Sequence, residues 1–236
     1  MNKDERKGRN LRPKDNPFVD LAPDERIQIV HMRLEHTKDL LLEVIRLNEQ
    51  RRAIVPIFDQ YWAATPDNTI VTFVVTIVQF EISHVCRLWD GAELSGYGLP
   101  SIAALLDSHD VLRLVAKRIE AGYPGGAQNA AKLEPLKAAL DLIGSAEISD
   151  TLKCVRNHRH KHIAHPILKT RQERNQSFEL AQAADNEELI AIAIKAISTL
   201  AWAASGQDVD YEAFRLDAQS AAQHFFGSVQ WPPPDF

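Results

Sequence analysis

The chain has 236 residues, of which 45% are hydrophobic and 25% are charged, so it falls in the ordinary range of globular proteins. Its formal net charge of −5 argues against a protein that coats nucleic acid, because binding through phosphates needs a cationic surface. Two cysteines, Cys86 and Cys154, are too few for a disulfide framework and favour a reducing compartment. The N-terminus has no secretory pattern, and the apolar stretch 70–80 is too short to span a bilayer. We therefore expect a cytoplasmic protein without a membrane segment.

The two ends of the chain differ in composition from the rest. The first sixteen residues are mostly charged and hold almost nothing apolar, so they cannot offset the entropy of ordering. The last six residues include three consecutive prolines, which favour an extended chain. These features predict a flexible charged tail over 1–22, a single domain over 23–226 and a proline-rich tail over 227–236.

Between the tails, apolar residues recur at three- and four-residue intervals, which predicts helices. The segment 69–89 is rich in β-branched residues, but its length without a turn signal favours one helix, apolar nearly all round, in the middle of a bundle. No alternating strand pattern competes, so the predicted fold class is all-α. The expected helices cover 23–47, 54–62, 69–89, 101–106, 110–121, 129–143, 150–165, 187–204 and 211–225. Ser149 or Asp150 can cap the helix over 150–165.

One segment carries most of the chemistry. Four of the nine histidines fall within eight positions, interleaved with three cations: His158, His160, His162, His165, Arg156, Arg159 and Lys161. The stretch 156–174 adds Lys169, Arg171 and Arg174, and Glu173 is its only acid. Histidine titrates near neutrality, and the guanidinium of arginine is always charged and carries several N–H donors. This composition therefore suits proton transfer beside a phosphate.

A helix through this segment would sort its residues into faces. Leu152 and Val155 would share an apolar side with Arg159 and Ile163, where a guanidinium is unfavourable unless it is paired. Three histidines form an adjacent stripe, whereas one histidine points elsewhere and two further side chains face solvent. The stripe consists of His158, His162 and His165, the separate histidine is His160, and the solvent-facing residues are Asn157 and Lys161.

Three interpretations of the histidines stay open at this point. Imidazoles at i and i+4 can bind a transition metal, but no HExxH motif is present and the nearby cations oppose a second positive ion. Histidine and arginine together can instead cleave a phosphodiester without metal. The third interpretation is a purely structural histidine, His165, at a helix end before Pro166. We expect no metal and no cofactor.

The residues 159–165, Arg-His-Lys-His-Ile-Ala-His, resemble the R-x(4–6)-H motif of HEPN domains, which are all-α modules common in prokaryotic defence. The ending Lys-His-Ile-Ala-His-Pro is similar to the RxKxxAH ending of the abortive-infection AbiU-type family. A second stretch, Arg-Leu-Trp-Asp at 87–90 followed by 99–106, resembles that family's RLxD…SLxxLL. The resemblance covers roughly 25–205 and implies an HEPN-like helical bundle with several shorter additional helices.

The resemblance also implies an activity. Such families are metal-independent endoribonucleases in which Arg and His of two protomers meet across a homodimer, which would explain an arginine on an apolar face. Here the implied catalytic residues are Arg159 and His165, although the pair Arg156 and His162 also fits the motif. The implied supporting residues are His158, His160, His162 and Lys161, and the implied RNA-binding residues are Arg156, Lys169 and Arg171.

Two further expectations accompany the resemblance. Arg87 and Asp90 form either a buried salt bridge that links helices or a second part of the RNA site. The implied biological role is phage defence or toxin–antitoxin growth arrest, and the implied partners are RNA, a second copy of the chain and an antitoxin protein. The alternative is a noncatalytic HEPN module that binds RNA, nucleotide or a partner protein through the same basic groove.

Overall fold

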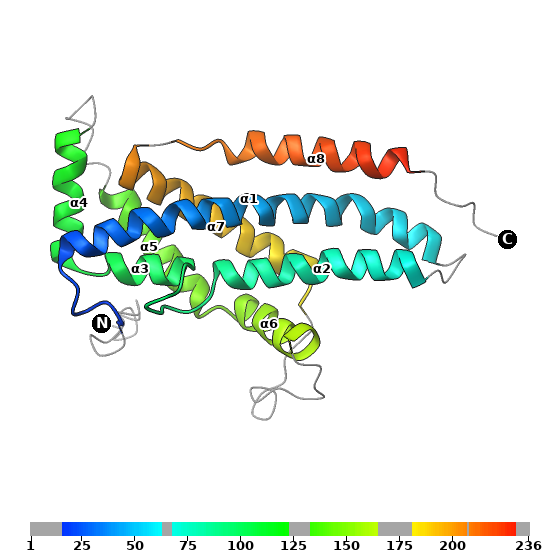
Figure 1. Ribbon diagram of the computed structural model, residues 1–236, viewed down its shortest axis with the longest axis horizontal. Helices are drawn as coiled ribbons and strands as arrows, with labels where there is room; N and C mark the ends of the chain where they lie inside the picture. The colour runs from blue at the N-terminus through cyan, green and yellow to red at the C-terminus, as the bar shows by residue number, and fades with distance from the viewer. Residues whose placement is uncertain (1–15, 63–67, 123–132, 165–180, 207, 230–236) are drawn as a thin grey trace, which may run out of the picture.

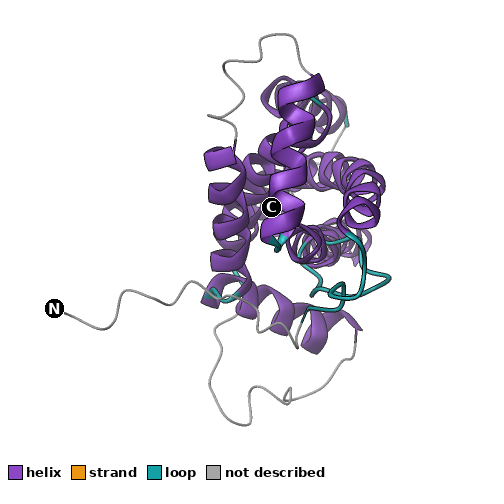
Figure 2. Cartoon of the chain, turned by 90° about the vertical axis from the view of Figure 1, so that its left-hand side faces the viewer, coloured by secondary structure: helices purple, strands orange, loops and turns teal. Residues whose placement is uncertain are grey.

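The computed structural model describes residues 16–62, 68–122, 133–164, 181–206 and 208–229. These residues form α-helices and one π-helical turn, and no strand occurs among them (Figures 1 and 2). The predicted all-α class is therefore confirmed. The helices are α1 (Pro23–Trp62), α2 (Asn68–Leu88), α3 (Leu99–Leu106), α4 (His109–Gly122), α5 (Leu133–Glu147), α6 (Asp150–His158), the π-helical turn η3 (Arg159–Ala164), α7 (Ala183–Ser205) and α8 (Tyr211–Ser228).

The 40-residue helix α1 is the axis of the molecule (Figure 1). It packs against α2, α3, α4, α7 and α8. The sequence predicts separate helices over 23–47 and 54–62, but α1 continues through Pro56. Proline removes the N–H that would bond the carbonyl of Arg52, and both residues are exposed, so water can reach that carbonyl. The expected break is therefore wrong.

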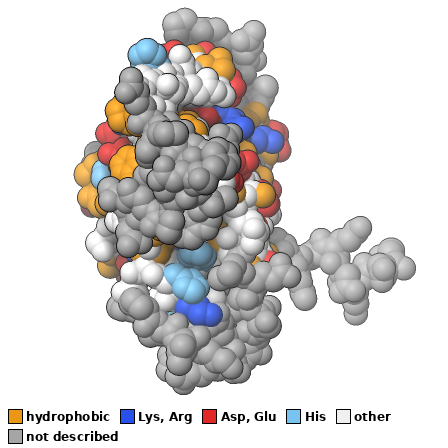
Figure 3. All heavy atoms as spheres, turned by 90° about the vertical axis from the view of Figure 1, so that its right-hand side faces the viewer, with side chains coloured by type: hydrophobic (Ala, Val, Ile, Leu, Met, Phe, Trp, Pro, Cys, Tyr) orange, Lys and Arg blue, Asp and Glu red, His pale blue; other side chains and the backbone are white. Residues whose placement is uncertain are grey.

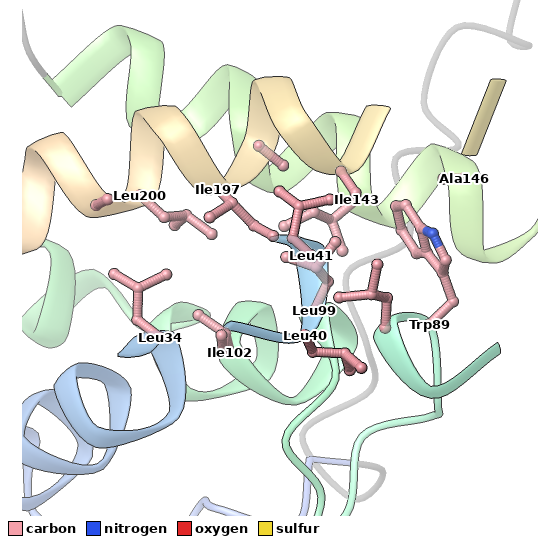
Figure 4. Packing of buried hydrophobic residues seen from close by; sticks show 14 of the residues in the cluster. Leu34, Leu40, Leu41, Trp89, Leu99, Ile102, Ile143, Ala146, Ile197 and Leu200 are labelled. Carbon is pink, nitrogen blue, oxygen red and sulfur yellow. The ribbon is translucent and has the colours of Figure 1, made fainter. Parts of the chain in front are cut away.

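The main core lies where α1, α3, α5 and α7 meet the end of α2. Figure 4 shows Leu41 of α1, Ile102 of α3, Ile143 of α5 and Ile197 of α7 directed toward one another, with the indole of Trp89 beside them. All five side chains are essentially inaccessible to solvent. Trp89 follows the last residue of α2, so this core fixes the chain at the point from which the candidate site extends.

The sequence predicts this helix in the middle of the bundle, and that prediction is wrong, because α2 lies at the edge. Its apolar residues Phe73, Val75 and Phe80 are exposed by 47%, 44% and 53%. By length and composition alone the window Val71–Leu88 could cross a membrane, with a mean hydropathy of 1.4. Its inner face nevertheless packs on α1, α6 and α7, as a helix of a bundle does. The surrounding helices thus cover one side of α2 only.

A buried polar cluster joins α1, α2 and α7. The carboxylate of Glu81 is inaccessible to solvent and pairs with Arg51, whose Nε lies 2.7 Å from Oε2. Asn48 and Asn186 donate to the other carboxylate oxygen at 3.1 and 3.2 Å. Burial raises the pKa of Glu81, against the opposite pull of Arg51 and the two amides. The cluster ties three helices together in one register.

The N-terminal boundary of the domain lies earlier than the sequence predicts. Phe18 is 1% exposed and belongs to the main core, and Asn16 donates to the carbonyl of Ala104 at 2.8 Å. Residues 16–22, expected in the tail, are therefore part of the folded domain because an aromatic side chain anchors them. Residues 1–15 and 230–236 lie outside the described residues, and α8 extends two residues beyond the expected end of the domain at 226.

Candidate functional site

The candidate site is carried by α6 and η3. Ser149 caps α6 by accepting from the backbone N–H of Leu152 at 3.1 Å, in agreement with the predicted cap. The helix does not stay α-helical to residue 165, because Arg159–Ala164 form a π-helical turn. A π turn is wider than an α turn and is frequent at functional sites. Asn157, expected to face solvent, is only 5% exposed, so that assignment is wrong: α6 is covered on more than its apolar side.

Arg156 is fixed to the end of α2. Its Nη2 donates to the backbone carbonyl of Trp89, one of the carbonyls that a helix C-terminus leaves without an intrahelical partner. A guanidinium also suits the negative end of a helix dipole. Arg156 therefore joins α6 to α2, and this use of the guanidinium favours a structural role over the implied contact with RNA.

Arg159 is one turn further along and reaches the surface. Its Nη1 lies 3.4 Å from Oδ1 of Asp90, and the two side chains are 37% and 51% exposed. Cys86 is buried near the end of α2, where burial raises the pKa of its thiol to about 11, against the opposite effect of the Arg159 charge. The guanidinium of Arg159 thus pairs with a carboxylate that follows the end of α2.

The buried salt bridge expected of Arg87 and Asp90 is wrong. Arg87 is exposed on the last turn of α2, and the carboxylate of Asp90 pairs with Arg159 instead. The cause is the end of α2 at Leu88: Asp90 lies beyond the helix and turns toward η3, whereas Arg87 still follows the outer face of the helix. The second interpretation of Arg87, a part of the RNA site, remains a prediction.

The loop after Asp90 holds that residue in place. A Cβ at Gly98 would lie 2.7 Å from the carbonyl oxygen of Asp90 and 3.1 Å from its nitrogen, so only glycine allows the two backbones to approach. Arg33 of α1 donates to the carbonyls of Glu93 and Leu94 in the same loop. The close approach of Gly98 therefore fixes the backbone of Asp90, and the two hydrogen bonds of Arg33 fix the loop that follows it.

The histidines of the segment differ in their surroundings. The rings of His158 and His162 lie 4.9 Å apart, and partial burial, followed by the charge of His162, lowers the pKa of His158. His160 and His162 are exposed, and Lys161 is half-buried. Figure 3 shows histidine side chains beside a basic one on this end of the molecule. His165, Lys169 and Arg171 lie outside the described residues.

No metal centre is evident in the described part of the chain, where no group of three or more His, Cys, Asp or Glu could hold an ion. The structure does show an arginine paired with a carboxylate, and two exposed histidines in the same π-helical turn as that arginine. This set can bind and polarise a phosphate and can exchange protons with it. Three contacts could not be read from the sequence: those of Arg156 with Trp89, of Arg159 with Asp90, and of Gly98 with Asp90.

Fold and site together define a helical-bundle protein that presents an Arg/His helix at its surface. The family model HEPN_AbiU2, described as AbiU2, matches residues 71–225, more than half of the chain. The chain therefore belongs to the AbiU2 family of HEPN proteins. The match begins in α2 and ends in α8, so it starts later and ends later than the resemblance at 25–205. No curated protein and no solved structure gives a significant match.

Proposed function

We propose that this chain is a metal-independent endoribonuclease of the HEPN type. The observation that carries the proposal is the position of Arg159: a half-exposed guanidinium held at the surface by one carboxylate, on the helix that bears the histidines. A guanidinium in this position can stabilise the negative charge that develops on phosphoryl oxygens. Membership of the AbiU2 family supports the same activity and a role in phage defence or growth arrest.

In the proposed reaction, His165 accepts the proton of a ribose 2′-hydroxyl, whose oxygen attacks the adjacent phosphorus. The bond from phosphorus to the 5′-oxygen breaks, that oxygen takes up a proton, and a 2′,3′-cyclic phosphate remains. Arg159 stabilises the negative charge of the phosphorane. His158, His160, His162 and Lys161 are the supporting residues of the site, and Lys169, Arg171 and Arg87 contact the RNA backbone.

The geometry favours Arg159 over Arg156 as the arginine of the motif. Arg156 is tied to the carbonyl of Trp89, so the alternative pair of Arg156 and His162 would require that contact to break. Arg159 reaches the surface and pairs with a solvent-accessible carboxylate, so it can meet a phosphate without breaking a contact between helices. The pair of Arg159 and His165 is therefore the one that we propose.

The proposed active form is a cytoplasmic homodimer in which two such helices meet. Arg159 already has a partner in its own chain, so its place on an apolar face does not by itself require a second copy. The dimer rests on the family alone, and an antitoxin protein is a further partner of the proposed role. Light scattering at micromolar concentration tests the dimer, and a strict monomer would remove the composite site.

Cleavage of RNA by the purified protein tests the activity. End-labelled RNA is incubated in excess chelator with the wild type, Arg159→Ala and His165→Ala. The proposal predicts cleavage by the wild type only. Intact RNA across varied substrates would favour the noncatalytic alternative, a HEPN module that binds RNA, nucleotide or a partner protein, and equal cutting by His165→Ala would exclude the proposed site.

A further inference from the structure

We propose that Asp90 is a positioning residue that holds the guanidinium of Arg159 at the angle needed to receive a phosphate. This inference rests on the proposed function, because it concerns the same reaction. The evidence is the contact between Oδ1 of Asp90 and Nη1 of Arg159 at 3.4 Å. The sequence alone assigns Asp90 a structural bridge or an RNA contact, and neither is this role.

The ion pair between Asp90 and Arg159 adds too little stability to explain why the backbone of Asp90 is packed so closely. Both side chains are about half exposed, at 51% and 37%, and exposed pairs of this kind contribute about 0–1 kcal/mol to stability. Nevertheless the backbone of Asp90 is closely packed. The preceding residue, Trp89, is fully buried, and Gly98 packs directly on the Asp90 main chain.

The closely packed backbone of Asp90 restrains the guanidinium of Arg159. The close packing of Gly98 on its main chain gives Asp90 a fixed place, from which its carboxylate reaches Nη1 of Arg159. The contact uses Nη1, while a phosphate prefers two parallel N–H donors of the fork. Asp90 can therefore stay paired with Arg159 while the fork accepts the phosphate.

The same contact could have the opposite effect if the carboxylate competed with phosphate for the arginine. Competition is strongest when a carboxylate occupies both terminal nitrogens at short distance. Here the contact is made by one nitrogen and is longer than the usual 2.7–2.9 Å of a charge-assisted hydrogen bond. The geometry therefore points to orientation and not to blocking.

A direct test measures the arginine itself. In protein labelled with ¹⁵N-arginine, rotation about the Cζ–Nε bond of Arg159 is followed by NMR, with the signals assigned from Arg159→Lys. We expect slow rotation in the wild type and fast rotation in Asp90→Asn. Asp150→Asn is the matched control, because its exposed carboxylate pairs with Lys153 on α6 and not with Arg159. Equal rotation rates in wild type and Asp90→Asn would overturn the inference.

The kinetics of RNA cleavage provide a second test. A misplaced catalytic group costs on the order of 10- to 100-fold in rate, so Asp90→Asn should lower kcat by that factor with a small change in KM. Asp90→Glu should recover part of the loss. Faster cutting by Asp90→Asn would show that Asp90 blocks the site. If the wild type does not cut at all, the proposed function fails, while the NMR result still decides whether Asp90 restrains Arg159.

Discussion

The guanidinium of Arg156 donates a hydrogen bond to the backbone carbonyl of Trp89, at the point where α2 ends. This contact joins the histidine-bearing helix to the residue that anchors the main core, because the Trp89 side chain is fully buried. The next arginine, Arg159, makes its polar contact with the exposed side chain of Asp90. We therefore expect two arginines three residues apart to have different roles, Arg156 in stability and Arg159 in the proposed site.

Replacing the two arginines separates these roles. Arg156→Ala leaves the Trp89 carbonyl without its partner, and an unsatisfied buried group costs about 1–3 kcal/mol, so the free energy of unfolding should fall by that amount. Arg159→Ala removes an exposed pair and should change it by less than about 1 kcal/mol. Urea denaturation followed by circular dichroism measures both. A larger loss for Arg159→Ala than for Arg156→Ala would contradict the assignment.

Gly98 offers a second test, through the backbone of Asp90. In Gly98→Ala the new Cβ would lie 2.7 Å from the Asp90 carbonyl oxygen, so the loop or Asp90 must move. We expect a loss of about 1–3 kcal/mol in stability, as for other overpacked sites, and slower RNA cleavage. Gly91→Ala in the same loop is the control, because a Cβ there meets nothing within 4 Å. Identical behaviour of the two variants would refute the close approach.

The buried cluster around Glu81 should contribute more to the free energy of unfolding than an exposed ion pair does. Arg51→Ala leaves a buried carboxylate without its cation and should destabilise the protein by about 3–5 kcal/mol. Glu134→Ala removes an exposed pair with Lys137 and should cost less than about 1 kcal/mol. Thermal or urea unfolding distinguishes the two. A stable Arg51→Ala protein would mean that the cluster does not hold α1 and α2 together.

His158 should make stability depend on pH. Partial burial lowers its pKa below the ordinary value of 6.5, so the folded protein disfavours the protonated ring. The unfolded chain takes up a proton first as pH falls through 6.5, and stability present above that pH is lost as it falls toward the lowered value. Unfolding free energies measured from pH 7.5 to 5.5 should decline less in His158→Gln than in wild type. The exposed His160 serves as control: an equal effect of His160→Gln would exclude His158 as the cause.

The sequence predicts the helices well because their apolar spacing is regular, and the cap at Ser149 follows from its side chain. The extent of α1 is missed because polar residues interrupt the apolar spacing between 47 and 54, although Asn48, Glu49 and Arg51 are buried there in polar contacts with α2 and α8. The π turn is missed because no residue pattern marks it. The partners of Arg156 and Arg159 are missed because Trp89 and Asp90 lie almost seventy residues away, and only the packing of α2 against α6 brings them together.

The products of the reaction test the central claim most directly. The wild-type protein is incubated in chelator with an RNA of defined sequence, and with the same RNA carrying a single 2′-deoxyribose on the 5′ side of the cut. Mass spectrometry then identifies the new ends. The account predicts a 2′,3′-cyclic phosphate from the first RNA, no cut at that position in the second, and no product with Arg159→Ala. Cleavage of the deoxy-substituted RNA at the same bond, or undiminished cutting by Arg159→Ala, would contradict it.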